Sequence, residues 1–373
     1  MAENTRTVTC EAPVNIAVIK YWGKSNEELI IPLNDSISVT LSTEHLRART
    51  TIRSNSGSRE ITFSLDGKEE VLTKRFLRAV ELCRAEAKRQ NTSTAEELAQ
   101  GLSIVSENNF PTAAGLASSA AGFACLVTAL KHYYRITGDV SGIVRQGSGS
   151  ACRSVFGGFV RWLKGTAPDG SDSIAQQVKP ASHWPEMRVL ILVVSDHKKE
   201  TSSTHGMKTT AETSRLLKYR ADVLVPQRCA EMTAAITAKN FAEFAEITMR
   251  DSNQFHAVCL DTYPPIFYLN SVSQAIIEMV HIYNQYKGTP TVAYSFDAGP
   301  NAFLFTLEDN VNEVAGLISA TFSEMIDFRG LPLQPIRTEA SLADRLNQIP
   351  SSSSLRYVIS TTVGDGAKIV HEE

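Results

Sequence analysis

The chain has 373 residues, of which 43% are hydrophobic and 21% are charged, and its formal net charge is −3. This length favours two domains, and the composition is ordinary for a globular protein. The slightly acidic balance argues against a nucleic-acid partner bound through its phosphates.

The first hundred residues predict strands followed by a helix. Residues 7–19, 36–54 and 60–64 are rich in Val, Ile and Thr and read as strands. An amphipathic helix with Lys and Arg on its wet face follows, marked by the apolar residues Leu72, Phe76, Val80 and Cys83.

A small-residue segment, Asn109–Gly122, comes next, after a predicted strand at residues 103–106. No charged side chain occurs between Glu107 and Lys131. Gly115 can adopt a positive φ, and the alanines let a ligand approach the backbone closely. Ser118 or Ser119 can cap the helix that follows, which we expect to run to about Tyr134.

The start of that helix predicts a phosphate site. Free N–H groups, a positive dipole end and the absence of bulky side chains suit an anion, and a nucleotide phosphate fits best. A buried helix that needs small residues for packing is the alternative, which Pro111, Gly115 and the two serines disfavour. The segment is not a Walker A motif, since no Gly-Lys-Ser/Thr follows, so a lysine must come from elsewhere.

The second half of the chain is richer in helix. Residues 189–194 predict a buried strand, residues 210–285 are helical in pattern, and residues 291–307 predict a hairpin whose turn lies at 297–301. We expect the helical stretch to break at Pro226 and at Pro264-Pro265. His183-Trp-Pro185 interrupts the pattern, so we predict an α+β fold with domains at residues 1–187 and 188–373.

Neither a membrane nor an oxidising compartment is indicated. The N-terminal residues have no apolar signal core, and the run at 189–194 is too short to span a bilayer. The six cysteines are scattered without C-x-x-C spacing, which disfavours a zinc site and predicts free thiols. We therefore expect a cytoplasmic protein.

Four polar clusters could carry chemistry, and two of them lie in the first half. Asn15, Lys20, Tyr21 and Lys24 gather at a predicted strand end and suit an anionic ligand, although a solvated lysine pair is the commoner interpretation of such a cluster on its own. Residues 147–154 place serines and Arg153 among glycines, and the guanidinium can hold a carboxylate or phosphate in a bidentate manner. A tight turn with a surface arginine is the alternative.

The other two clusters lie in the second half. Residues 200–205 carry hydroxyls that could bind a second anion, and a capped helix start explains them equally well. Asp297 stands at the tip of the predicted hairpin, where it could face a cleft or be an ordinary turn residue. Partial burial would raise the pKa of its carboxyl, and neighbouring lysines would lower it.

Together these segments resemble a known family. The stretch Pro111–Ser119 resembles the phosphate-binding motif of the GHMP kinase superfamily, and the fuller set is similar to the mevalonate diphosphate decarboxylase family of the eukaryotic type. The matching segments span most of the chain in order and are residues 12–24, 111–119, 147–153, 251–256 and 296–301.

The resemblance implies a two-domain GHMP kinase-like α+β fold with its active site in the cleft between the domains. It implies that mevalonate 5-diphosphate and ATP react to isopentenyl diphosphate, ADP, phosphate and CO2, with Mg²⁺ as cofactor. It also implies a homodimer.

Site residues follow from the same resemblance, position by position. The catalytic residues would be Asp297, facing the C3 hydroxyl, Lys20, near the reacting group, and Arg153, holding the C1 carboxylate. Further substrate contacts would be Asn15, Tyr21, Lys24, Ser148, Ser150 and either Ser202 or Ser203. ATP contacts would be Ser106, Asn108, Pro111, Ala113, Ala114, Gly115, Leu116, Ala117, Ser118 and Ser119. No acidic residue can be assigned to Mg²⁺, which we expect near Ser119, held chiefly by phosphates, serine oxygens and water.

Two other functions compete. A small-molecule kinase of the same superfamily would make a stable phosphorylated product, and the hairpin with Asp297 and the segment 21–24 argue against it. A non-catalytic binding protein on this fold is disfavoured by the presence of Asp297, Arg153 and Lys20. Release of CO2 alongside ADP separates all three.

Overall fold

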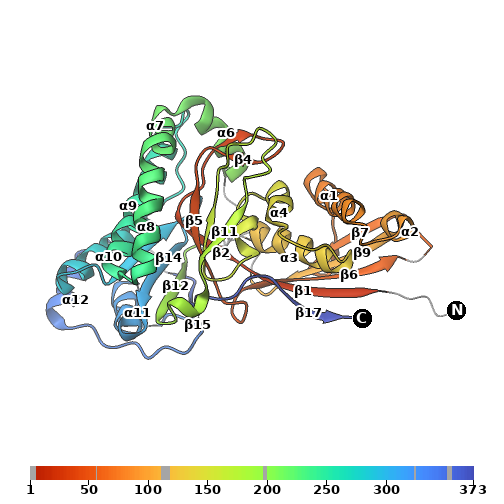
Figure 1. The fold of residues 1–373 in the computed structure, drawn as a ribbon. Coiled ribbons are helices and arrows are strands. Elements are labelled where there is room, and N and C mark those ends of the chain that lie inside the picture. Colours follow the sequence, from red (N-terminus) through yellow and green to blue (C-terminus); the bar gives the residue numbers. More distant parts are fainter. Residues whose placement is uncertain (1–5, 56, 111–117, 196–199, 323–324, 351–354) are drawn as a thin grey trace.

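A computed structural model describes residues 6–55, 57–110, 118–195, 200–322, 325–350 and 355–373. Figure 1 shows two sheet-and-helix regions joined through a central sheet. The strands are β1 (Thr7–Pro13), β2 (Asn15–Ile19), β3 (Lys24–Asn26), β4 (Ile31–Pro32), β5 (Ser36–Thr40), β6 (Arg47–Asn55), β7 (Ile61–Leu65), β8 (Lys68–Glu69), β9 (Gly101–Asn108), β10 (Phe159–Trp162), β11 (Ala175–Lys179), β12 (Met187–Val193), β13 (Val292–Phe296), β14 (Ala302–Leu307), β15 (Phe328–Gly330), β16 (Tyr357–Thr362) and β17 (Lys368–Glu372).

The helices lie against these sheets. They are α1 (Lys74–Gln90), α2 (Ala95–Ala99), α3 (Ser118–Tyr133), α4 (Ser141–Gly147), α5 (Ala151–Ser154), the 3₁₀ turn η1 (Ala181–His183), α6 (Ser203–Thr213), α7 (Arg215–Tyr219), the π-helical turn η2 (Arg220–Leu224), α8 (Val225–Ala238), α9 (Phe241–Leu260), α10 (Ser271–Lys287), α11 (Glu308–Phe322) and α12 (Ala340–Leu346).

A six-stranded sheet organises the first region, in the order β17-β1-β6-β9-β7-β8. Helix α3 packs on β1 and β6 and buries ten of its residues, which is why its sequence is almost entirely small or apolar. The last strand, β17, pairs antiparallel with β1, so the first and last strands lie side by side (Figure 1).

The central sheet has the order β11-β10-β5-β2, and helices cover it from both regions. Helix α5 packs on β2, β5 and β10, and helices α8 and α9 also pack on this sheet. Strand β2 is buried along its whole length, as expected for a strand covered on both faces. The carboxyl end of β2 leads to Lys20, which lies where the two regions meet.

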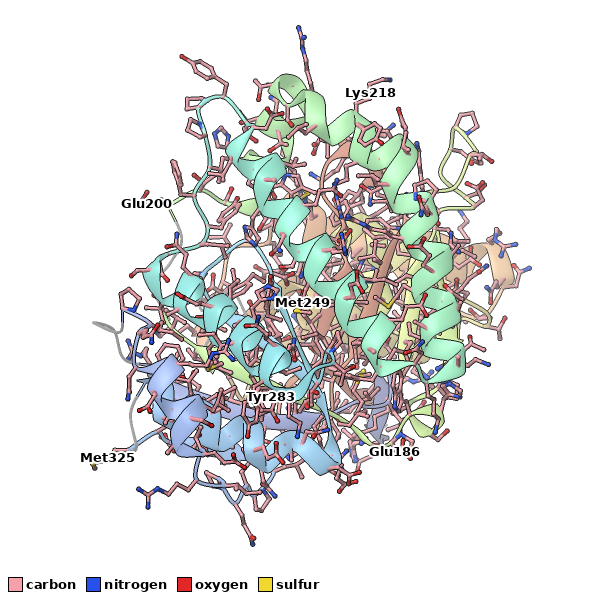
Figure 2. All side chains as sticks on the ribbon, turned by 90° about the vertical axis from the view of Figure 1, so that its left-hand side faces the viewer. Glu186, Glu200, Lys218, Met249, Tyr283 and Met325 are labelled. Atoms are coloured by element: carbon pink, nitrogen blue, oxygen red, sulfur yellow. The ribbon has the colours of Figure 1, made fainter. Side chains whose placement is uncertain are left out.

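The second region is built on a five-stranded sheet in the order β13-β14-β12-β16-β15. Helices α9, α10 and α11 pack on it, and Figure 2 shows this helical layer face on, with Met249 of α9 near its middle and Tyr283 of α10 below. No helix in the described part of the chain has both the length and the apolar character needed to cross a bilayer.

The predicted α+β class is confirmed, with two differences in the elements. Residues 7–19 form two strands in different sheets, separated at Val14, where one strand was expected. Pro226 does not end the helical stretch: it lies in the first turn of α8, directly after the π-helical turn η2. The hairpin is present, with Phe296 opposite Ala302. The division at residues 187 and 188 stays a prediction.

Candidate active site

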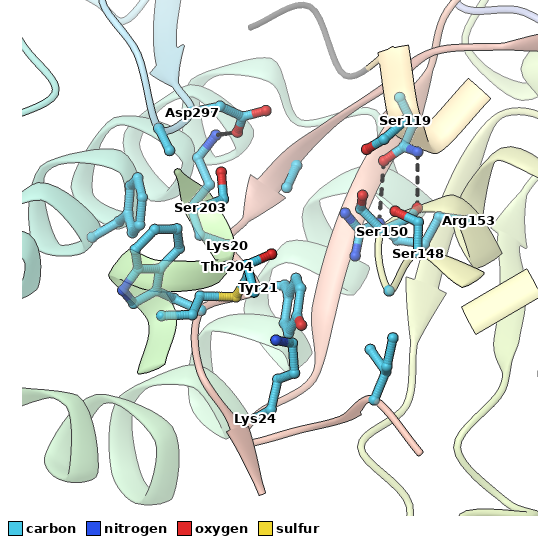
Figure 3. A pocket seen from close by; sticks show the side chains of 18 of the residues that line it. Lys20, Tyr21, Lys24, Ser119, Ser148, Ser150, Arg153, Ser203, Thr204 and Asp297 are labelled. Carbon is cyan, nitrogen blue, oxygen red and sulfur yellow. Dashed lines mark hydrogen bonds and ion pairs between the residues drawn. The ribbon is translucent and has the colours of Figure 1, made fainter. Parts of the chain in front are cut away.

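A cavity of about 360 Å³ lies where the two regions meet. Its walls come from the chain after β2, the start of α1, the start of α3, the turn into α5, the start of α6 and the turn between β13 and β14. Figure 3 shows Lys20 and Asp297 facing each other on one side, with Ser119, Ser148, Ser150 and Arg153 gathered on the other.

Lys20 and Asp297 form an ion pair in which Lys20 Nζ lies 2.7 Å from Asp297 Oδ1. The lysine side chain is only 3% exposed and the aspartate side chain 34% exposed, so the carboxylate reaches the cavity while the ammonium is enclosed. Burial lowers the pKa of Lys20, and the charge of Asp297 and its hydrogen bond oppose that shift. The pair joins the end of β2 to the hairpin turn, 277 residues apart.

Arg153 is a buried cation without an anionic partner among the described residues. Its Nε donates to Asn15 Oδ1 at 3.3 Å and its Nη1 donates to Ser36 Oγ at 2.5 Å. Burial lowers the pKa of its guanidinium. A charge buried among neutral groups is costly, so the site favours a ligand that supplies a carboxylate or phosphate.

Asn15 fixes this wall of the cavity. Its side-chain amide donates to the Ser150 carbonyl at 3.1 Å and to Ser154 Oγ at 2.8 Å, while its oxygen accepts from Arg153. Asn15 is therefore fully engaged in holding the arginine and the adjoining turn.

Tyr21 and Lys24 lie between the two sides of the cavity (Figure 3). The ring of Tyr21 packs on Trp162 with centroids 4.6 Å apart, and its buried hydroxyl has no hydrogen-bond partner in the described part of the structure. Burial raises the pKa of that hydroxyl, so it is a neutral donor. Lys24 Nζ pairs with Glu27 at 2.7 Å.

The predicted serines separate into those at the cavity and those away from it. Ser118, Ser119, Ser148, Ser150 and Ser203 line it. Helix α3 begins at Ser118, so the first two lie in its first turn, at the positive end of the helix dipole.

Ser202 lies outside the cavity lining and caps α6, because its hydroxyl accepts from the His205 N–H at 3.2 Å. Ser106 and Asn108 lie in β9 and likewise do not line the cavity. Ser106 shares a hydrogen bond with Thr50 at 2.8 Å. The other predicted ATP contacts lie outside the described residues and are Pro111, Ala113, Ala114, Gly115, Leu116 and Ala117.

The cavity also contains residues that sequence reasoning missed. Arg75 belongs to α1, whose basic residues were expected to face solvent, yet it lines the cavity. Trp22, Met207 and Phe255 form an apolar part of the wall, and all three belong to one buried cluster. The sequence did not predict this cluster, because its members come from segments that lie far apart along the chain.

No group of three or more His, Cys, Asp or Glu side chains able to hold a metal occurs among the described residues. The start of α3, where magnesium was predicted, presents the hydroxyls of Ser118 and Ser119 to the cavity. Such hard donors suit Mg²⁺ when phosphate oxygens complete its shell, so this donor set fits a metal that arrives with a nucleotide.

Two family models match the chain. Residues 12–175 match the diphosphomevalonate decarboxylase-like N-terminal domain, and residues 189–370 match the mevalonate 5-diphosphate decarboxylase C-terminal domain. The diphosphomevalonate decarboxylase of Danio rerio is 50% identical and covers 99% of this chain and 94% of its own length.

Solved structures are also similar to this chain. A crystal structure of mevalonate 5-diphosphate decarboxylase is 43% identical with a TM-score of 0.86, covering 99% of this chain and 98% of the other. A complex of MDDEF with MVAPP, AMPPCP and magnesium is 30% identical with a TM-score of 0.78, covering 98% of this chain and 99% of the other.

Proposed function

The chain belongs to the mevalonate 5-diphosphate decarboxylase family, and we propose that Asp297, Lys20 and Arg153 carry out this family's reaction in the cavity. The enzyme is an ATP-dependent carboxy-lyase that converts (R)-mevalonate 5-diphosphate to isopentenyl diphosphate, releasing ADP, phosphate and CO2. The observation that carries the proposed roles is the pairing of Asp297 with a buried lysine opposite a buried arginine that has no carboxylate partner among the described residues.

Asp297 removes the proton from the C3 hydroxyl of the substrate. A tertiary alcohol is a poor nucleophile, so a carboxylate held at hydrogen-bond distance contributes both orientation and proton acceptance. Lys20 holds Asp297 in place through the ion pair at 2.7 Å. Phosphorylation then makes the C3 oxygen a leaving group, and the same carboxylate stabilises the positive charge left at C3.

Arg153 holds the C1 carboxylate of the substrate. Its guanidinium is fixed by Asn15 and Ser36, so it presents its remaining donors to the cavity in a set direction. That orientation aligns the C1–C2 bond with the departing C3 oxygen, so that the electron pair of the breaking bond forms the double bond as CO2 leaves.

The nucleotide side of the site is formed by the start of α3. Ser118 and Ser119 offer hydroxyls and the helix N-terminus to phosphates, and Lys24 and Arg75 supply positive charge from other walls of the cavity. We propose that Ser119 contributes an oxygen to Mg²⁺, which when bound neutralises phosphate charge during phosphoryl transfer.

Measuring CO2 and ADP together tests the proposal. Protein supplied with mevalonate 5-diphosphate, ATP and Mg²⁺ is expected to release one CO2 for each ADP. ADP without CO2 would instead identify a kinase with a stable phosphorylated product, and the absence of both would identify a binding protein.

We also propose a cytoplasmic location, a homodimer and a domain division after residue 187. All six cysteines are free and buried, which suits a reducing compartment. The homodimer rests on the resemblance alone, and sedimentation velocity separates one chain from two. Limited proteolysis with cleavage between residues 180 and 190 would support the domain division.

A further inference from the structure

The backbone of Lys20 is held by side chains. Strand β2 ends at Ile19, so the next peptide groups leave the sheet. The Lys20 N–H donates to Asp251 Oδ2 at 2.8 Å, and the Lys20 carbonyl accepts from Asn34 Nδ2 at 3.1 Å and Arg220 Nη2 at 3.2 Å. Both peptide groups that flank the Lys20 side chain are thereby fixed from outside the strand.

Asp251 is a fully buried carboxylate at the centre of this arrangement. Arg220 donates to both of its oxygens at 2.8 Å, and Arg228 adds a third guanidinium contact at 2.9 Å. Burial by itself would raise the pKa of Asp251, but the Arg220 charge, its hydrogen bonds, the Lys20 N–H and Arg228 hold that pKa below its usual range. Asp251 therefore stays ionised, and its carboxylate accepts the hydrogen bond from the Lys20 N–H.

The next residue of the same helix supports the other member of the ion pair. Ser252 of α9 is fully buried, and its hydroxyl accepts from the Phe296 N–H at 3.0 Å. Phe296 is the last residue of β13 and directly precedes Asp297. One turn of α9 thus contacts the backbone on both sides of the ion pair.

We propose that Asp251 and Ser252 are positioning residues, which hold the backbone of Lys20 and Phe296 so that the Lys20–Asp297 pair keeps its separation and direction. The inference rests on the proposed roles of Lys20 and Asp297. A simpler account is that the buried charges only join α9 to the central sheet, and that account predicts lost stability without a kinetic signature.

Ser252→Ala tests the hairpin side. Loss of one backbone contact next to Asp297 is expected to lower kcat by ~5- to ~20-fold, with KM for mevalonate 5-diphosphate changed by less than ~2-fold. Thr248→Val is the matched control, because Thr248 is equally buried on α9 and its hydroxyl has no partner among the described residues. Equal kcat values for the two variants would overturn the proposal.

A double-mutant cycle with Asp297→Asn shows whether Ser252 acts through Asp297. If it does, Ser252→Ala lowers kcat in the wild type but has almost no effect in the Asp297→Asn background. Additive losses would overturn the inference. Failure of the proposed function would look different, because Asp297→Asn alone would then retain normal turnover.

Asp251→Asn tests the lysine side through the pH profile of kcat. The charged or titratable groups that face Lys20 are Asp297, Arg153, Asp251, Arg220 and His256. Removing the Asp251 charge removes a negative charge that raises the pKa of Lys20 and leaves two arginines uncompensated. The alkaline limb, where Lys20 loses its proton, should therefore move to lower pH. If Asp251→Asn folds and its alkaline limb lies at the same pH as in the wild type, the proposed role of Asp251 is overturned. If this variant does not fold, the double-mutant cycle of Ser252→Ala with Asp297→Asn decides the proposal.

Discussion

The two sides of the cavity hold their charges in opposite ways. On one side, Lys20 and Asp297 pair with each other at 2.7 Å. On the other side, Arg153 is just as buried but is surrounded by Asn15 and Ser36, which carry no charge. Within the part of the chain that the structure describes, one buried cation thus has a counterion and the other has none.

This difference in counterions gives each side of the cavity its own proposed role. A carboxylate held by a lysine is positioned to accept a proton, whereas an arginine among neutral partners gains most from a charged ligand. A substrate that carries both a hydroxyl and a carboxylate would meet the first side with its hydroxyl and the second with its carboxylate.

Asp297→Asn should break the first side with the largest effect. The amide cannot take the proton, so kcat is expected to fall by ~10²- to ~10⁴-fold while the substrate still binds. Steady-state CO2 release and the dissociation constant of mevalonate 5-diphosphate measure the two effects. Near-normal turnover would place the base elsewhere.

Arg153→Ala should break the second side. Leaving the substrate carboxylate without its partner is expected to cost about 2–5 kcal/mol in kcat/KM. Arg145→Ala is the control, because Arg145 is equally buried but donates to the Leu29 and Gly170 carbonyls and does not line the cavity. The control should lose stability, and its folded fraction should keep its KM. An unchanged kcat/KM for Arg153→Ala would show that this arginine does not meet the substrate.

His256 provides a further test of the side that holds the Lys20–Asp297 ion pair. Burial, and then the charge of Lys20, lower the pKa of His256 to about 3, so it adds no second cation beside Lys20. Below pH about 6.5 the unfolded chain takes up a proton that the folded chain refuses, so stability falls as pH falls toward 3. This loss amounts to about 2 kcal/mol at pH 5.

The comparison is between wild type and His256→Asn, with denaturant unfolding measured from pH 7 to pH 4. The variant should lack this part of the pH dependence, so its stability should decline less steeply. Equal slopes for the two proteins would contradict the neutral state of His256.

The smallest effects are expected from Ser203→Ala and Ser202→Ala. Together these variants show which of the two neighbouring serines contacts phosphate. Ser203 lines the cavity, so its loss is expected to raise KM for mevalonate 5-diphosphate by up to ~10-fold. Ser202 caps α6, so its loss should cost about 1 kcal/mol of stability and leave KM unchanged. The reverse pattern would assign the phosphate contact to Ser202.

Much of the site could be predicted because its chemistry is local. Lys20 follows an apolar strand, Arg153 lies among small residues, and Asp297 stands at the tip of a hairpin, so local sequence made all three candidates. Their roles came from the resemblance to the family. Arg75 could not be predicted, since a basic residue on an amphipathic helix looks the same whether it meets solvent or a ligand. The support from Asp251 could not be predicted either, because its partners are Lys20, just after β2, and arginines of η2 and α8.

The fold shows the same limit. The hairpin at 292–307 is a local pairing and was predicted, whereas β17 pairs with β1 across almost the whole chain. The alternating pattern of residues 7–19 continues through Val14, so it does not reveal that β1 and β2 enter different sheets. Long-range pairing is decided by packing, which a period of two residues does not encode.

A crystal structure with mevalonate 5-diphosphate and a non-hydrolysable ATP analogue tests the central claim most directly. The account predicts that the C1 carboxylate pairs with Arg153, that the C3 oxygen lies within about 3.2 Å of the Asp297 carboxylate, and that the γ-phosphate analogue lies at the start of α3. A complex in which the C1 carboxylate lies away from Arg153, or the C3 oxygen away from Asp297, would contradict it.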